Sequence, residues 1–307
     1  MEKIKGLVAA PFTPMTADGA INLNIITSYY QFLKKNGVAG AFINGSTGEG
    51  VSQTTQERKQ VAEAWANEIK QDASPMKLIN LVGGTSYQEC IELAKHSQSV
   101  GVDAIAILAP FYFKPPTVKE LAEFVKVIGQ AVPELPVYFY HIPVLTGVAF
   151  AMIDLLKELH GQIPNFAGIK YTHEDFMDYL SCLHFADGQY DMLWGRDENM
   201  LSALVLGAEG SVGSTFNYAA PLYHQLMTAY EKGEIKEARQ LQQQSIDMIR
   251  LLGKYGGIGT GKAFMRYVGI ECGGFRLPVK AMTEEAYQQF VQDVKALEME
   301  ALFSKGE

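Results

Sequence analysis

The sequence has few cysteines and no long uninterrupted apolar run. Its three cysteines, Cys90, Cys182 and Cys272, form no CxxC pair, and their odd number and wide spacing argue against a disulfide framework or a zinc site. We expect three free thiols in a reducing cytoplasm. No apolar run approaches the roughly 18 residues that a membrane-spanning helix needs. The N-terminal stretch is interrupted by Pro11 and Pro14 and does not resemble a secretory signal, so we expect a cytoplasmic protein without membrane contacts.

Basic residues are also in deficit. The chain has 26 Lys and Arg against 34 Asp and Glu, a formal net charge of −8, which argues against a general affinity for nucleic acid. An anionic ligand would have to be held by local donors. The six histidines are scattered and no HExxH or other metal-ligand spacing occurs, so we expect no metal site. No Pro/Gly/Ser-rich linker divides the chain.

The 307 residues, 48% of them hydrophobic, instead alternate between short apolar runs and longer amphipathic segments. The runs are apolar throughout, as in a parallel sheet that is covered on both faces. Eight such units predict an α/β fold, a (β/α)8 TIM barrel; a doubly wound open sheet is the alternative. The predicted strands are 6–12, 38–45, 77–84, 103–110, 136–142, 166–172, 190–195 and 210–215. The predicted helices are 23–36, 54–71, 86–100, 117–131, 150–160, 174–186, 198–206 and 219–232.

No strand is predicted after residue 232. Helical patterns cover 234–256, 261–270 and 284–303, so we divide the chain into a barrel, 1–232, and a C-terminal helical extension, 233–307, packed on it as one structural unit. Within the extension, GGIGTGKA (256–263) nearly fits a phosphate-binding loop. Ala263 stands where the motif needs a hydroxyl, and a helix precedes it instead of a strand, so we interpret it as a turn between helices.

Reactive groups of such barrels lie where strands end, and Lys170 ends the sixth predicted strand. An amine that is half-buried among apolar side chains has a lowered pKa, and the neutral form can attack a ketone to give a Schiff base. The alternative is an ordinary lysine whose stem is buried while its ammonium group reaches solvent.

Two further strand ends carry candidate groups. Tyr140 ends the neighbouring fifth strand and could move protons beside Lys170, although a tyrosine there is often only core packing. We expect His141 to point to the other face in a structural role. After the second strand, NGSTGEG offers the hydroxyls of Ser46 and Thr47 and exposed backbone N–H groups, which suit a carboxylate; the alternative is an ordinary turn.

Five short motifs then occur in a familiar order: GSTGE, YHIPVLTG, GIKYT, WGRDE and GSVGSTFN. Together they resemble the N-acetylneuraminate lyases, which belong with dihydrodipicolinate synthase to the pyruvate-dependent class I aldolases. The resemblance covers essentially the whole chain. It implies reversible cleavage of N-acetylneuraminate, a sialic acid, to N-acetylmannosamine and pyruvate by a cytoplasmic homotetramer that needs no cofactor.

The resemblance also implies a role for each motif. Lys170 would form the Schiff base, Tyr140 would shuttle protons, and Ser46 and Thr47 would bind the carboxylate. Tyr112 would reach the site of a neighbouring subunit. The contacts to the polyhydroxy tail of the substrate would come from Thr172, Gly195, Asp197, Glu198 and Ser214.

Other activities stay open at this point. Another pyruvate-dependent aldolase, acting on 2-keto-3-deoxy sugar acids or resembling dihydrodipicolinate synthase, would use Lys170 and Tyr140 in the same way. Leu145 argues against the synthase, which carries an arginine there for its substrate carboxylate, and leucine cannot pair a carboxylate. His141 stands where many bacterial lyases have asparagine. A barrel that binds sugar acids without catalysis is a more distant alternative.

Overall fold

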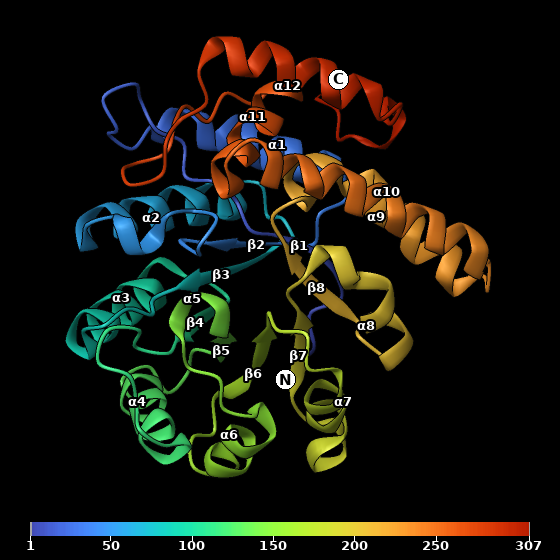
Figure 1. The fold of residues 1–307 in the computed structure, drawn as a ribbon. Helices are drawn as coiled ribbons and strands as arrows, with labels where there is room; N and C mark the ends of the chain where they lie inside the picture. Colours follow the sequence, from blue (N-terminus) through green and yellow to red (C-terminus); the bar gives the residue numbers. More distant parts are fainter. Residues whose placement is uncertain (1, 307) are drawn as a thin grey trace.

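Eight parallel strands close into a barrel in the order of the sequence, with β8 beside β1, so the predicted (β/α)8 barrel is confirmed. The computed structural model describes residues 2–306. Figure 1 shows the strands at the centre with the helices around them. The strands are β1 Gly6–Ala9, β2 Gly40–Ile43, β3 Lys77–Leu81, β4 Ala104–Leu108, β5 Val137–His141, β6 Phe166–Tyr171, β7 Asp191–Trp194 and β8 Gly210–Gly213.

A helix follows each strand, close to the predicted ranges. The start of α2 is fixed by a capping box, in which Thr54 Oγ1 accepts from the Glu57 N–H and the Glu57 carboxylate accepts from the Thr54 N–H. The short α5 was not predicted. None of the helices in residues 2–306 has the length and apolar character needed to cross a bilayer. The barrel helices are α1 Ile26–Lys35, α2 Thr55–Gln71, α3 Tyr87–Val100, α4 Val118–Gln130, α5 Pro143–Thr146, α6 Met152–Leu159, α7 Phe176–His184, α8 Met200–Leu206 and α9 Phe216–Glu231.

The strand side chains form two separate apolar layers. One cluster fills the inside of the barrel and includes Val8, Phe42 and Tyr140, while a larger one lies between strands and helices and includes Phe139 and Tyr171. Successive residues of a strand point to opposite faces, and here both faces are buried. This is the physical reason that the strand segments are apolar throughout rather than alternating.

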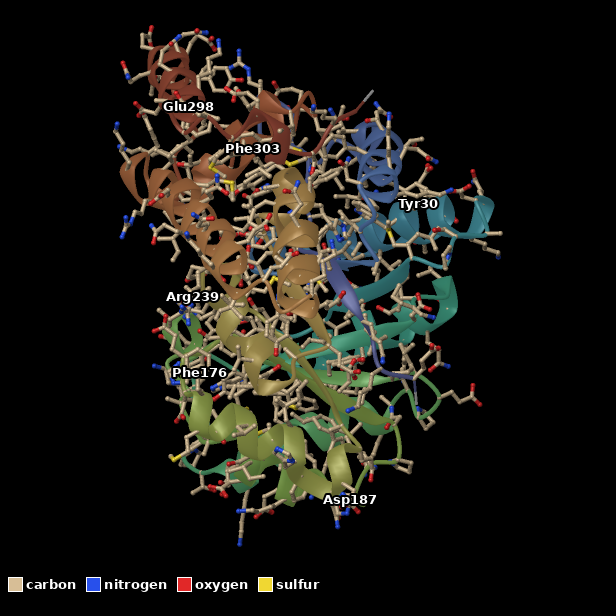
Figure 2. All side chains as sticks on the ribbon, turned by 90° about the vertical axis from the view of Figure 1, so that its right-hand side faces the viewer. Tyr30, Phe176, Asp187, Arg239, Glu298 and Phe303 are labelled. Atoms are coloured by element: carbon tan, nitrogen blue, oxygen red, sulfur yellow. The ribbon has the colours of Figure 1, made fainter. Side chains whose placement is uncertain are left out.

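The C-terminal helices lie together on one side of the barrel (Figure 1). They are α10 Ile235–Lys254, which packs along α9, α11 Thr260–Tyr267 and α12 Glu284–Ala296. Figure 2 labels Phe303, which is buried and lies against the rings of Phe264 and Tyr267. The turn between α9 and α10 contains the boundary that we predict at residue 232, and that division stays a prediction.

Of the helical patterns predicted in this extension, 284–303 is too long: the helix ends at Ala296, and Glu298 shortly after it has a left-handed φ of 54°. The pattern over 261–270 is confirmed as α11. The glycine-rich 256–263 stretch is a turn between α10 and α11 only over its first half, so Lys262 is helical and buried.

Candidate active site

Lys170 lies on the inner face of β6 and its amine does not reach solvent. The residue is 3% exposed, and Nζ lies 3.8 Å from the ring centroid of Phe42 and 4.1 Å from that of Tyr140. The alternative of an ammonium group in water is therefore wrong. Burial lowers the pKa of Lys170 to about 7, while the negative charge of Asp197 acts in the opposite direction.

The balance of forces on this amine favours the neutral form. Moving a lysine pKa from 10.5 to about 7 corresponds to roughly 5 kcal/mol against the protonated amine. The two aromatic ring faces favour the cation, but such contacts contribute only about 0.5–2 kcal/mol each. Desolvation therefore outweighs them, and near neutral pH a large fraction of the amine is a free nucleophile.

Tyr140 is the direct register partner of Lys170 on β5. Its ring meets the edge of Phe42 at 5.4 Å between centroids, and the residue is 4% exposed. Burial raises the pKa of Tyr140 to about 12, and the neighbouring hydroxyls of Ser46 and Thr172 oppose that rise. The resting group is therefore a phenol, with two hydroxyls beside it that would stabilise the phenolate.

Asp197 follows β7 and is buried without a cation at bonding distance among residues 2–306. Its Oδ2 accepts from the Thr215 N–H at 2.9 Å and from Thr215 Oγ1 at 2.6 Å. Burial raises the pKa of Asp197 to about 6, and the Thr215 donors and the charge of Lys170 limit that rise. At neutral pH this carboxylate is mostly ionised, an acceptor for ligand hydroxyls and a source of negative potential at Lys170.

Helices α9 and α10 support Asp197 through hydrogen bonds to Thr215 and to the Asp197 backbone. Tyr223 on α9 joins Thr215 Oγ1 at 2.6 Å to Ser245 Oγ on α10 at 2.7 Å. Gln242, also on α10, donates to the backbone oxygen of Asp197 at 3.1 Å. The loop after β7 is thus held through buried polar groups of α9 and α10 rather than by the barrel alone.

Two glycines provide the room that these side chains need. A Cβ at Gly195 would lie 1.9 Å from Thr172 Oγ1, and a Cβ at Gly213 would lie 2.1 Å from Asp197 Oδ1. Neither distance is possible for a real side chain. Gly195 therefore acts by leaving space for the buried Oγ1 of Thr172, the hydroxyl that lies beside the Tyr140 phenol.

The remaining predicted residues lie in loops at the same end of the barrel, where the strands end. Thr47 is buried and Ser46 and Ser214 are half-buried in the loops after β2 and β8. Glu198 is partly exposed and pairs with Arg196 at 2.6 Å. Tyr112, in the loop after β4, is 78% exposed, and its ring lies against that of Phe113.

His141 lies on the outer face of β5, as predicted. Its ring centroid is 5.1 Å from that of Tyr171 and 5.5 Å from that of His173. Burial and the neighbouring His173 lower the pKa of His141 to about 3, which keeps its ring neutral. It packs between the barrel and the helices and does not face Lys170.

Sequence reasoning missed several residues that form this site. Phe42, which contacts Lys170, was only one more apolar residue of a strand. Thr215 was visible as a strand-end hydroxyl but carried no distinguishing motif. Tyr223 and Gln242 could have been found only as polar residues on the buried faces of otherwise apolar helices.

A hollow lies at the opposite end of the barrel, where the strands begin, and is lined by Lys5, Lys77, Asp103 and Tyr138, among others. Its polar groups have partners: Lys77 pairs with Asp103, and Tyr138 donates to Asp191 at 2.8 Å. Because barrel chemistry occurs where strands end, we place the site around Lys170.

Within residues 2–306 no three His, Cys, Asp or Glu side chains are grouped to hold a metal ion. Cys90, Cys182 and Cys272 are buried free thiols.

The first testable consequence concerns the charge of Lys170. Reductive methylation with formaldehyde requires a neutral amine, so labelling of Lys170 should rise through a pH of about 7. Exposed Lys5, whose pKa is raised by its hydrogen bond with Glu209, should be labelled only at much higher pH. Asp197→Asn removes a charge that raises the Lys170 pKa, so the Lys170 curve should shift to lower pH. Site-resolved mass spectrometry measures both curves; coincident profiles for Lys170 and Lys5 would contradict this picture.

Comparison with known proteins agrees with the fold and places the chain in a family. The model of the dihydrodipicolinate synthetase family matches residues 3–297. The N-acetylneuraminate lyase of Pongo abelii is 41% identical over 97% of this chain and 93% of its own length, and that of Homo sapiens is 40% identical with the same coverage. The solved structure of Proteus mirabilis N-acetylneuraminate lyase superposes with a TM-score of 0.93 at 34% identity, covering 96% of this chain and 99% of that one. The chain, a closed barrel with a buried lysine facing a tyrosine, belongs to the dihydrodipicolinate synthetase family.

Proposed function

We propose that this protein is a Schiff-base aldolase that reversibly cleaves N-acetylneuraminate to N-acetylmannosamine and pyruvate. The observation that carries the proposal is the Lys170 amine, buried beside the Tyr140 phenol with a pKa of about 7. The Pongo abelii and Homo sapiens relatives, 41% and 40% identical over 97% of this chain, are N-acetylneuraminate lyases, which supports this substrate.

The first step is formation of the covalent intermediate. The neutral Lys170 amine attacks the C2 ketone of the open-chain substrate, and loss of water leaves an iminium. The phenol of Tyr140 donates the proton that the departing hydroxyl needs. The hydroxyls of Ser46 and Thr47, with the backbone N–H groups of their loop, hold the carboxylate next to C2.

The second step breaks the C3–C4 bond. Its electron pair flows into the iminium and gives an enamine, while the Tyr140 phenolate accepts the proton of the C4 hydroxyl as the aldehyde forms. The positive iminium close to the ring favours the phenolate, as do Ser46 and Thr172. N-acetylmannosamine leaves, the enamine is protonated at C3, and water releases pyruvate from Lys170.

The tail of the substrate would lie against the ends of β6, β7 and β8. Asp197 and Glu198 accept hydrogen bonds from its hydroxyls, and Thr172, Ser214 and the backbone at Gly195 complete the contacts. Leu145, on α5, is 63% exposed and offers no charge for a second carboxylate. That choice of side chain favours a sugar substrate over the aldehyde acid of a dihydrodipicolinate synthase.

Two substitutions should separate the proposed roles. Lys170→Ala should abolish pyruvate release from N-acetylneuraminate, and borohydride with pyruvate should no longer label the protein. Tyr140→Phe keeps the ring but loses the proton donor, so turnover should fall roughly 10²–10⁴-fold while borohydride still traps pyruvate on Lys170. A coupled assay for pyruvate and peptide mass spectrometry provide the measurements.

The same assay tests the other activities. Pyruvate release from 2-keto-3-deoxy sugar acids but not from N-acetylneuraminate would replace the substrate and keep the chemistry. Condensation of pyruvate with aspartate semialdehyde would favour the synthase. Binding of N-acetylneuraminate without turnover by the unaltered protein would contradict the enzymatic proposal.

The proposal includes a homotetramer in the cytoplasm. The loop after β4 presents Tyr112 and Phe113, which are 78% and 85% exposed, and an apolar surface of this kind is usually covered by a partner. Tyr112 would enter the mouth of the neighbouring barrel and touch bound substrate there.

Light scattering on the purified protein should give the mass of four chains. If Tyr112 completes a neighbouring site, Tyr112→Ala should lower turnover while pyruvate trapping on Lys170 persists, and Tyr87→Ala, at an exposed tyrosine on α3, is the matched control. A monomer with full activity would contradict this part of the proposal.

A further inference from the structure

The carboxylate-binding loop after β2 ends in a buried acidic residue, Glu49, which is 6% exposed. Its φ is +58°, and Asn44 at the start of the loop has a φ of +56°, so two residues other than glycine hold left-handed backbone conformations within six positions. Such conformations persist only where surrounding contacts enforce them. Ser46 and Thr47 lie between these two residues.

Both carboxylate oxygens of Glu49 are occupied by donors from the C-terminal extension. Lys262 Nζ, on α11, lies 2.9 Å from Oε1, and the backbone N–H of Arg276 donates to Oε2 at 2.8 Å. Lys262 is 3% exposed and also donates to the Gly274 carbonyl at 2.6 Å. This is a buried ion pair between residues 213 positions apart in the chain.

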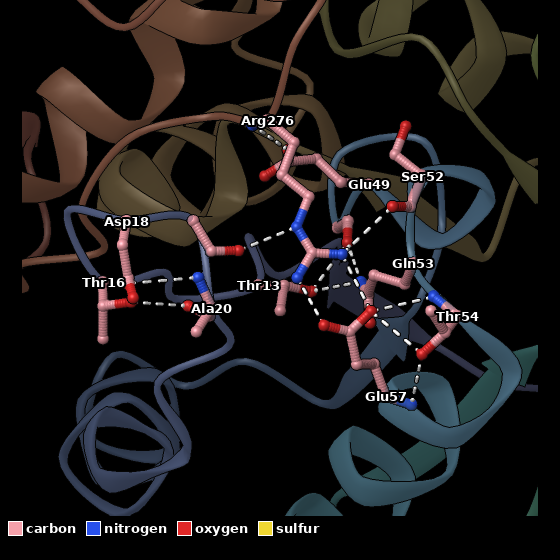
Figure 3. A network of polar contacts seen from close by, with 12 residues as sticks. Thr13, Thr16, Asp18, Ala20, Glu49, Ser52, Gln53, Thr54, Glu57 and Arg276 are labelled. Atoms are coloured by element: carbon pink, nitrogen blue, oxygen red, sulfur yellow. Dashed lines mark hydrogen bonds and ion pairs between the residues drawn. The ribbon is translucent and has the colours of Figure 1, made fainter.

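The side chain of Arg276 connects the C-terminal extension to residues before and after the β2 loop (Figure 3). Its guanidinium pairs with both oxygens of Glu57 on α2 and donates to the carbonyls of Ser52 at 3.1 Å and Gly19 at 2.9 Å. Glu57 is also part of the α2 capping box. One arginine therefore connects the C-terminal extension to the residues on either side of Glu49 along the chain.

The other side of the loop is held by the barrel. The Gly48 carbonyl accepts from Thr13 Oγ1 and from Gln53 Nε2, both at 2.6 Å. At Gly261, one residue before Lys262, a Cβ would lie 2.2 Å from the ring of Phe12, so α11 packs directly on the segment after β1. The loop after β2 thus lies between the barrel and the C-terminal extension, and Glu49 is its contact with the extension.

We propose that Lys262 and Arg276 are positioning residues for the reaction: through Glu49 they hold Ser46 and Thr47 in the shape that binds the substrate carboxylate. The inference rests on the proposed function, in which that loop binds pyruvate. It also gives a role to Lys262 of the glycine-rich 256–263 stretch, whose lysine binds a carboxylate of the chain itself rather than a phosphate.

Energetics favour a positioning role over a purely stabilising one. A buried ion pair is costly to desolvate and can often be replaced by apolar side chains without loss of stability. What an apolar side chain at position 262 would not supply is the directed donor for Oε1 of Glu49. Together with the backbone N–H of Arg276 on Oε2, that donor fixes the orientation of Glu49 and with it the backbone N–H groups of the loop.

The test compares Lys262→Met with Arg266→Met. Both remove a cation from α11, but Arg266 pairs with Glu284 at the surface and is 40% exposed. Pyruvate is titrated into each protein with borohydride, and adduct on Lys170 is quantified by mass spectrometry. The half-saturating pyruvate concentration reports carboxylate binding, and the adduct at saturation reports the competent fraction, which separates affinity from loss of folded protein.

We expect Lys262→Met to raise the half-saturating pyruvate concentration about tenfold, equivalent to 1.4 kcal/mol of binding free energy. The KM for the cleavage substrate should rise with it, more than kcat falls, and Arg266→Met should leave both unchanged. If Lys262→Met does not fold, Arg276→Met, at a residue with one-fifth of its side chain exposed, should show a smaller increase. Trapping with unchanged half-saturation in the folded variants would overturn the inference, whereas absence of trapping in the unaltered protein would overturn the proposed function instead.

Discussion

The proposed chemistry depends on the burial of one amine. Lys170 lies inside a closed ring of strands, against the faces of Phe42 and Tyr140, without a carboxylate at bonding distance among residues 2–306. Desolvation of the charged form lowers the pKa of Lys170 to about 7. The apolar packing inside the barrel keeps the amine in this water-poor environment. Asp197 is buried in the loop after β7, and its negative charge opposes this lowering of the Lys170 pKa without cancelling it.

The fold could be predicted from the sequence because the barrel buries both faces of every strand. That constraint makes the strand segments apolar throughout, and each is followed by an amphipathic helix that covers it. The error in the C-terminal extension lies where the local backbone conformation interrupts the helical period: the helix predicted to Phe303 ends at Ala296, and Glu298 has a left-handed φ.

The candidate site could be predicted only in part. Lys170 and Tyr140 are polar groups at the ends of apolar strands, which is a signal in a single sequence, and the structure makes them register partners. Gln242 and Lys262 lie on helices distant in sequence from their partners Asp197 and Glu49, and these contacts form only when the C-terminal extension folds against the barrel. For Tyr112 the single chain provides no contact with the site, because its proposed partner is another copy.

The central claim, that the amine of Lys170 forms a covalent bond with a ketone, is tested most directly by ¹³C NMR of pyruvate labelled at C2. Mixed with the protein near neutral pH, it should give a protein-bound carbon resonance typical of an imine or enamine, absent in Lys170→Met. Resonances of free ketone and hydrate alone, with the unaltered protein folded and in excess, would contradict the account.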